Sequence, residues 1–325
     1  MQRREFIKLI GAVTVAWPLA ARAQRPKVWR VAQVRAGTPK KLGRSATALE
    51  ERLNELGYVN GKTIMLVNRF VPRPQAMKTA IEELHSNIDL LVVWGTVGSV
   101  YAKKLISDLP VVFVSVGAPV EIGLISSLAR PGGNMTGVTF EAADQMYPKR
   151  LQVLKELVPN LKRVAVLGAQ GDPNVTLAMT ALQKSAPVLG VTLLPVYIRS
   201  TDDLPAAFDQ MRRKRAEGLV VIAGNLTAFS GKRIADLALK YRLPSCHAFN
   251  ETVVAGGLVS LGPNRVWMAR QAADYVDKII KGSKAKDLPV EEPNKYDFYI
   301  NLKTARTLGI KVPEPLLALA DQIIK

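Results

Sequence analysis

The sequence contains few of the residues that usually carry catalysis or bind metals. Its 325 residues include two histidines, His85 and His247, and one cysteine, Cys246. A single cysteine cannot form an internal disulfide. The chain has no HExxH motif and no CxxC pair, which are the spacings that identify many zinc sites. This composition excludes a disulfide-stabilised small domain and argues against a zinc enzyme.

The histidines and the cysteine do not form a recognisable catalytic group. Cys246 and His247 are neighbours at the end of an expected strand, so their side chains should point to opposite faces. His85 follows the last apolar turn of an expected helix, where a solvated cap is typical. A phosphate-binding loop is not indicated either, because residues 168–171 lack GxxxxGK[ST] and a complete GxGxxG. We therefore predict no catalytic residue, no metal site and no cofactor.

Apolar runs long enough to span a bilayer are also absent. The run at 9–21 is short, follows an Arg-Arg pair at positions 3 and 4, and ends in an Ala-Arg-Ala site. That order is typical of a secretory signal peptide. The arginine pair, followed by Phe-Ile-Lys, favours the twin-arginine route, with an ordinary secretory signal as the alternative. We assign 1–23 to a twin-arginine signal peptide cleaved near Ala23. With no cysteine there to take a lipid, we expect a soluble periplasmic protein and a monomer.

Acidic residues are scarce relative to basic ones. The chain holds 45 Lys and Arg against 27 Asp and Glu, a formal net charge of +18. The basic residues are scattered, and no basic run exceeds 212–215. A nucleic-acid partner is therefore not expected, because such binding requires clustered basic residues. The excess charge fits a basic exported protein with an anionic ligand or surface.

What the chain does contain is a regular alternation of strands and helices. Short apolar runs alternate with amphipathic stretches of helical spacing, and the alternation restarts after residue 160. The expected strands are 28–34, 63–70, 89–94 and 110–116, then 163–168, 191–198, 218–224 and 243–249. Nearly continuous apolar strands separated by helices indicate parallel sheets covered on both faces.

These two units predict an α/β protein of two Rossmann-like lobes with mostly parallel sheets, joined by a hinge of several crossings. Lobe 1 is expected at 27–140, with about 258–290 returning to it. Lobe 2 is expected at 141–257, with about 291–325 as a hinge-crossing C-terminal segment. That segment should hold a half-buried strand at 295–302 and a last amphipathic helix that includes Ile323. Several thin crossings are how a hinge between domains is built.

Glycine and polar residues stand where the expected strands end. Ligands of open α/β sheets bind just beyond the carboxyl ends of strands, so both units should contribute to one cleft. At the helix start after strand 89–94, free backbone N–H groups would favour a carboxylate. Each residue could instead only cap a helix. The expected ligand-binding residues from these ends are Gly95, Thr96, Ser115, Val116, Gly117 and Ala118 of the first unit and Asn174, Asn225, Phe249, Asn250 and Glu251 of the second.

From Lys27 to its end the chain resembles the substrate-binding protein family of ABC transporters that includes the tryptophan- and tyrosine-type binding proteins. The resemblance implies a type I periplasmic binding fold that closes on a small molecule and delivers it to an ABC permease in the inner membrane. The stretches that carry the resemblance are LNELGYVNGKTIML (53–66), DLLVVWGT (89–96), PVVFVSVGAPVEIGLISSLARPGGNMTGVTF (110–140), ELVPNLKRVAVL (156–167), AGGLVSLGP (255–263) and INLKTARTLGIKVPEPLLALAD (300–321).

Two loops depart from the family's pattern. After the fourth strand the family often has Ser/Thr-Asp-Pro, where this chain has Gly-Ala-Pro at 117–119. Ala118 cannot pair with the ammonium of an amino acid, although Glu121 or Glu251 could substitute. The ligand could therefore be an aromatic or aliphatic carboxylate as well as an amino acid. After the first strand stands Arg35, which could clamp a carboxylate bidentately or lie solvated at the rim.

Three functions stay open at this point. The leading one is a non-catalytic carrier for an ABC importer. The second is a periplasmic sensor that presents its ligand to a membrane signalling receptor. The third is a secreted enzyme on the same fold, which the near absence of histidine disfavours.

Overall fold

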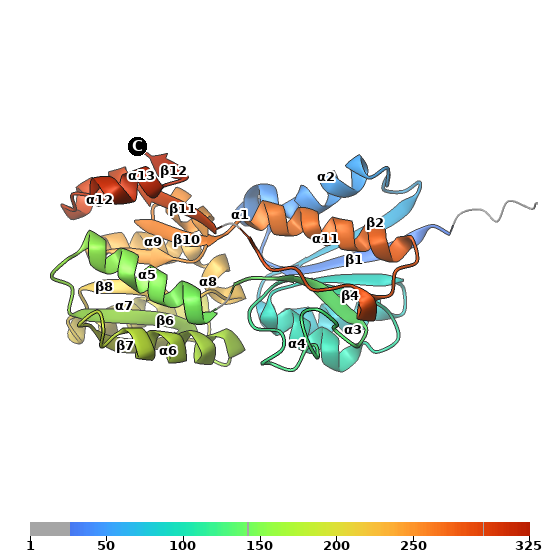
Figure 1. Cartoon of the computed structure of the whole chain (residues 1–325), viewed down its shortest axis with the longest axis horizontal. Helices are drawn as coiled ribbons and strands as arrows, with labels where there is room; N and C mark the ends of the chain where they lie inside the picture. The colour runs from blue at the N-terminus through green and yellow to red at the C-terminus, as the bar shows by residue number, and fades with distance from the viewer. Residues whose placement is uncertain (1–26, 142, 295) are drawn as a thin grey trace, which may run out of the picture.

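The computed structural model describes residues 27–325 except 142 and 295. The expected signal peptide at 1–23 lies outside the described residues. The described chain forms two lobes side by side, each a sheet with helices packed on its faces (Figure 1). In this part of the chain, no helix is long and apolar enough to cross a membrane. The predicted α/β class with mostly parallel sheets is confirmed.

Lobe 1 is built on a five-stranded parallel sheet with the order β2-β1-β3-β4-β5. Its central strand β3 is buried along its whole length, because its Leu, Val and Trp side chains face helices on both sides. One face is covered by α2 and α11, the other by α3 and α4. The bounds are β1 (Trp29–Ala36), α1 (Pro39–Leu42), α2 (Ala48–Glu55), β2 (Ile64–Val71), α3 (Met77–His85), β3 (Leu90–Trp94), α4 (Thr96–Leu105), β4 (Val111–Val116), β5 (Met135–Thr139) and, from late in the chain, α11 (Arg265–Ile280).

Lobe 2 holds a seven-stranded sheet with the order β12-β11-β10-β9-β8-β6-β7. All of its neighbouring strands are parallel except the pair β10 and β11. The bounds are α5 (Ala143–Leu157), β6 (Arg163–Ala169), α6 (Pro173–Ser185), β7 (Thr192–Ile198), α7 (Leu204–Arg213), β8 (Gly218–Val221), α8 (Asn225–Phe229), α9 (Gly231–Lys240), β9 (Ser245–His247), α10 (Asn250–Val254), β10 (Val259–Pro263), β11 (Tyr296–Asn301), α12 (Leu302–Leu308), α13 (Glu314–Leu319) and β12 (Gln322–Ile324).

The chain passes between the lobes after β5, after β10 and again before β11 (Figure 1). The passage before β11 lies beside strand β5, where the Glu291 N–H donates to the Gly137 carbonyl at 3.0 Å. Helix α11 is fixed to lobe 1 by an ion pair of 2.9 Å between Arg52 and Asp274. Strand β10 belongs to the second sheet, so we propose that the returning segment begins at Arg265 instead of at about 258.

Two elements differ from the sequence expectation. Ile323, expected on the last helix, lies in β12, where it pairs with Ile300 of β11. This strand forms because the edge of β11 offers unpaired backbone groups, and a three-residue strand has no periodicity to reveal it. Strand β5 was not expected, because glycine and proline dominate the stretch at 131–140. Gly137 is required there, since an added Cβ would lie 2.0 Å from the Phe113 carbonyl oxygen.

Candidate functional site: a cavity at the junction of the lobes

A small cavity lies where the strand ends of the two sheets face each other. Its volume is about 20 Å³, which is room for about one water molecule. A ligand larger than water can therefore enter only if the lobes move apart. The lining residues are Arg35, Ala36, Leu42, Trp94, Gly95 and Ser115 from lobe 1, Asn225, Ala228, Phe229 and Phe249 from lobe 2, and Arg265 at the passage between them.

Arg35 is a buried cation in the wall of this cavity. Its residue is 1% exposed, so the solvated rim position considered from the sequence is wrong. The guanidinium donates to the carbonyl and to Oγ of Ser45 at 2.7 and 2.9 Å, and it lies 3.6 Å from the ring centre of Trp94. The Trp94 ring is itself held by a hydrogen bond to Gln33. The Nε of Arg35 has no hydrogen-bond partner among the described residues.

A second arginine reaches the same cavity. Arg265 is the first residue of α11, directly after the N-cap Asn264, and it is 8% exposed. Its guanidinium lies 5.0 Å from the ring centre of Phe249, and its NH1 is 3.6 Å from Oε1 of Glu251. Its Nε is also unpartnered within the described part of the chain. Sequence reasoning missed Arg265, although it too follows a strand end and would have been found had β10 been recognised.

The two cations repel each other in a poorly solvated place. Burial lowers the pKa of Arg35 well below its ordinary value, the positive charge of Arg265 lowers it further, and the negative charge of Glu251 opposes both. The cavity wall therefore holds two buried guanidinium groups and one nearby carboxylate. Two buried cations with one carboxylate leave a positive charge that is costly to bury, and an anion would offset this cost.

Lobe–lobe contacts close the cavity on one side. Asn174 Nδ2 donates to Thr96 Oγ1 at 2.9 Å, and Asn225 Nδ2 donates to the Trp94 carbonyl at 3.3 Å. Glycines make this approach possible. A Cβ at Gly95 would lie 2.0 Å from Oδ1 of Asn225, and one at Gly117 would lie 2.4 Å from Oδ1 of Asn174. The strand ends are thus in direct contact across the junction.

The expected site residues do not all meet in one place. Arg35, Gly95, Ser115, Asn225 and Phe249 line the small cavity, whereas Thr96, Gly117 and Asn174 form the lobe contact beside it. Asn250 and Glu251 line an outer cavity of about 530 Å³ that shares Leu42 and Arg265 with the small one. The Val116 side chain is fully buried in the core of lobe 1 and does not line the small cavity.

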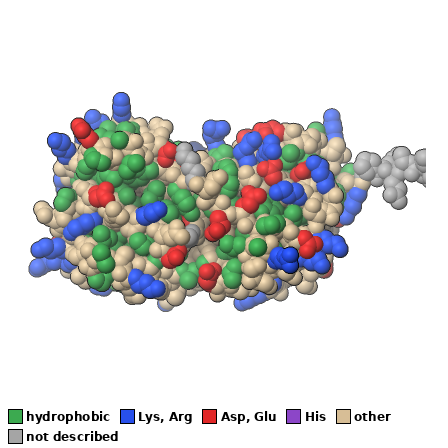
Figure 2. Space-filling model, in the orientation of Figure 1, with side chains coloured by type: hydrophobic (Ala, Val, Ile, Leu, Met, Phe, Trp, Pro, Cys, Tyr) green, Lys and Arg blue, Asp and Glu red, His purple; other side chains and the backbone are tan. Residues whose placement is uncertain are grey.

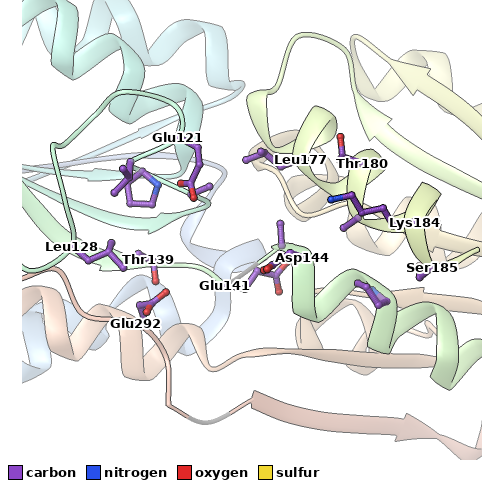
Figure 3. A pocket seen from close by; sticks show the side chains of 16 residues that line it. Glu121, Leu128, Thr139, Glu141, Asp144, Leu177, Thr180, Lys184, Ser185 and Glu292 are labelled. Carbon is purple, nitrogen blue, oxygen red and sulfur yellow. The ribbon is translucent and has the colours of Figure 1, made fainter.

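Ala118 lines a different cavity, of about 510 Å³, on the hinge side of the junction. Figure 3 shows Glu121 on the lobe 1 side of this space and Thr180 and Lys184 from α6 on the opposite side. Asp144, at the start of α5, lies between them. Because this cavity is bordered by carboxylates, it is electrostatically unlike the arginine-lined one.

The cysteine and the histidines are not arranged for catalysis. Burial raises the pKa of Cys246 to about 12, which keeps its thiol protonated. Burial, and then the charge of Arg150, lowers the pKa of His247 to about 3. His85 is partly exposed and contacts Asp108 at 2.6 Å on the surface of lobe 1. The described residues contain no group of side chains that could hold a metal ion.

The surface carries the excess charge without a single basic patch on the face shown in Figure 2, where Lys and Arg side chains are spread over both lobes. Asp and Glu side chains also lie on both lobes of this face, several of them near the junction. The face shown therefore carries no concentrated positive charge that would guide an anion.

The family model for ABC transporter substrate-binding proteins matches residues 42–324. The chain belongs to this family. Its similarity to the tyrosine-binding protein of Clostridioides difficile (strain R20291) is 23% identity over 262 residues, which are 80% of this chain and 74% of that protein. The resemblance inferred from the sequence is confirmed, and the family's role is substrate binding, which is not enzymatic.

Several solved structures have a similar fold. A conserved domain protein from Vibrio cholerae is 26% identical, with a TM-score of 0.84 over 91% of this chain and all of that one. An ABC domain in complex with L-Trp from Streptococcus pneumoniae is 23% identical, with a TM-score of 0.84 over 92% of this chain and all of that one. A periplasmic binding protein from Burkholderia mallei, at 13% identity, has a TM-score of 0.56 over 80% of both chains. The predicted two-lobed periplasmic binding fold is confirmed.

Proposed function

We propose that this family member is the periplasmic solute-binding protein of an ABC importer. The cleft between the lobes takes up a small molecule, either amino acid-like or an aromatic or aliphatic carboxylate. The closed form then delivers it to a permease in the inner membrane. The observation that carries this proposal is the pair of buried arginines, Arg35 and Arg265, that face one cavity at the junction of the lobes.

The arrangement of the chain supports uptake by closure. A cavity of about 20 Å³ cannot admit a solute from outside, so binding requires the lobes to separate. Separation would break the contact between Thr96 and Asn174, where each side chain donates to the other, and the hydrogen bond from Asn225 to the Trp94 carbonyl. Such bonds contribute only about 1 kcal/mol each. The passages between the lobes can absorb the rotation.

The related proteins guide the choice of candidate ligands. One of them is a tyrosine-binding protein and another was solved with L-Trp. At the low identities seen here these names do not transfer to this chain, but they belong in any screen. The absence of a poised cysteine or histidine supports a role without catalysis.

A ligand screen tests the proposal. The mature protein is heated with and without amino acids, aromatic acids, aliphatic carboxylates and sugars, and the unfolding midpoint is recorded. A ligand present at 100 times its dissociation constant should stabilise the folded state by about 2.7 kcal/mol, which raises the midpoint measurably. If no small molecule in a broad collection raises the midpoint, the binding function loses its support.

A deletion strain separates transport from sensing. If the protein feeds a permease, loss of its gene should abolish high-affinity uptake of the labelled ligand found in the screen. If it feeds a signalling receptor, uptake should persist and only the transcriptional response to the ligand should disappear.

A further inference from the structure

We infer that the ligand is an apolar monocarboxylate without an α-ammonium group. This inference rests on the proposed function and names the ligand class for the same cleft. It is carried by the charges around the small cavity, by the carboxylates that are missing from its wall, and by its aromatic lining.

Among the charged side chains that line the small cavity or lie in an ion pair with its wall, one positive charge is uncompensated. Arg35 and Arg265 contribute two cations, and Glu251 contributes one anion, 3.6 Å from Arg265. Each arginine keeps an Nε–H that has no partner within the described chain. A ligand with one negative charge neutralises this set and can accept from those donors. A zwitterionic amino acid brings no net charge and leaves the excess in place.

An ammonium group would find no carboxylate in the wall of the small cavity, since none of the described residues that line it is an aspartate or glutamate. Ala118, at the position after β4 that could have held a carboxylate, lines the other cavity, where Glu121, Asp144 and Glu292 also lie. Asp172, near the lobe contact, is used to cap α6 through the Asn174 N–H.

Two glutamates need separate consideration. The two terminal nitrogens of the buried Arg150 guanidinium donate to the two carboxylate oxygens of Glu141, so this carboxylate is not available to a ligand. Glu251 is the only carboxylate among the described residues that line the outer cavity, and its Oε2 has no hydrogen-bond partner within the described chain. Its Oε1 already faces Arg265, so an ammonium would have to compete with that guanidinium.

The rest of the wall is suited to an apolar body. Trp94, Phe229 and Phe249 contribute aromatic rings, and Leu42 and Ala228 contribute aliphatic surface. Polar groups in the wall are few, apart from the arginines, Ser115 and Asn225. A ligand with one carboxylate at the arginines and a ring or branched chain against these side chains fits both the charge and the surface.

Matched pairs of compounds test the inference by calorimetry on the mature protein. The pairs are 3-phenylpropionate with L-phenylalanine and indole-3-propionate with L-tryptophan, which differ only in the ammonium group. 3-Methylbutanoate and 4-methylpentanoate cover the branched chains, with L-valine and L-leucine as their amino acid counterparts. We expect at least one acid to bind about 100-fold more tightly than its amino acid, and its uncharged amide to bind no better than the amino acid.

The possible failures can be told apart. An amino acid that binds as tightly as its acid overturns the inference, while the binding function stands. The same holds if no acid in the panel binds but another compound in the broad screen raises the unfolding midpoint. If nothing in that screen binds, both the inference and the proposed function fail.

Two variants test whether the carboxylate of the ligand binds at Arg265. Arg265→Met should weaken binding of the acid about 10-fold or more, because a charge-assisted hydrogen bond is lost. Arg44→Gln, an exposed arginine that lines the outer cavity, is the matched control and should change affinity less than about threefold. Equal effects of the two variants would contradict a specific role for Arg265.

Glu251→Gln distinguishes the two possible roles of that carboxylate. If Glu251 only balances Arg265, its removal should leave binding of the acid unchanged or make it tighter. If Glu251 holds a ligand ammonium, the variant should instead weaken binding of an amino acid, and the inference falls. The unfolding midpoint of each variant shows that it is folded before binding is measured.

Discussion

His247 shows how burial alone can change the chemistry of a residue. Its ring is buried in lobe 2, with one nitrogen 2.9 Å from Oγ of Ser245. Burial and the positive charge of Arg150 lower its pKa to about 3, so the ring is neutral in the folded protein at any ordinary pH. In the unfolded chain the same ring takes up a proton near pH 6.5.

This difference predicts a loss of stability in acid. The pKa of His247, a basic group, is lower in the folded protein than in the unfolded chain. Its contribution to the free energy of unfolding is therefore complete above about pH 6.5 and is lost as the pH falls toward 3. The loss is about 1.4 kcal/mol per pH unit, or roughly 3 kcal/mol between pH 6.5 and pH 4. Urea unfolding of the wild type and of His247→Asn at both pH values measures it, because the variant should lack this part of the loss.

The difference between wild type and variant, together with one control variant, makes the comparison specific. Asp172 acts in the opposite direction, since burial raises its pKa to about 6, and its contribution is lost as the pH rises from about 4 to 6. Taking the difference between wild type and variant cancels this effect. His85→Asn, on the surface of lobe 1, should keep the acid loss of the wild type. An unchanged acid loss in His247→Asn would contradict the explanation.

At the scale of elements, the loop after β4 and the start of α6 meet across the lobe junction. Gly117 stands at the point of contact, where a Cβ would lie 2.4 Å from Oδ1 of Asn174. Its backbone is not in the left-handed region, so a larger residue can be accommodated by the loop itself. A substitution here should therefore act on closure of the cleft and leave folding of the lobe intact.

We predict that Gly117→Ala weakens ligand binding about 10-fold, because Asn174 must shift and its bond to Thr96 is lost. The unfolding midpoint without ligand should change little. Calorimetry with the ligand from the screen measures the effect. Gly133→Ala, whose Cβ would have only the end of Lys103 within 4 Å, serves as the control on the same lobe. Adding Asn174→Ala to Gly117→Ala should restore part of the affinity, and a further loss would argue against the steric explanation.

At the scale of the whole molecule, the protein consists of two sheets whose strand ends meet in a contact zone (Figure 1). One apolar cluster of lobe 1 continues across this zone to Ala223, Ala248 and Phe249 of lobe 2. The arginine-lined cavity and the carboxylate-bordered one lie at this zone, so both must change when the lobes move. Under the proposed function, opening should expose the arginines to water and relieve their mutual repulsion. Closure should then be favoured when an anion replaces that water.

Small-angle X-ray scattering of the mature protein tests this coupling. The radius of gyration should fall by about 1 Å when the ligand is added, as the hinge closes. Arg265→Met should bring the radius without ligand closer to that of the closed form, because one of the repelling charges is gone. The same radius with and without a bound ligand would mean that uptake does not use lobe closure.

The sequence by itself determined the two α/β units and the family. Apolar strands such as 89–94 and 110–116 are buried on both faces, so their composition alone indicates parallel sheets. Gly95, Thr96 and Asn225 were predicted at the cleft because strand ends in such sheets share one edge. These are local properties, and local sequence is sufficient to read them.

Only the tertiary structure decided which charged groups meet. Arg35 and Arg265 are far apart in the chain and face one cavity because α11 returns to lobe 1 after β10. The same return buries Arg35 and places Glu251 next to Arg265. The hydrophobic periodicity of the sequence does not predict such a contact, since the contact depends on how the chain passes between the lobes. The charge of the site, and with it the ligand class that we propose, therefore follows from packing and not from the order of residues.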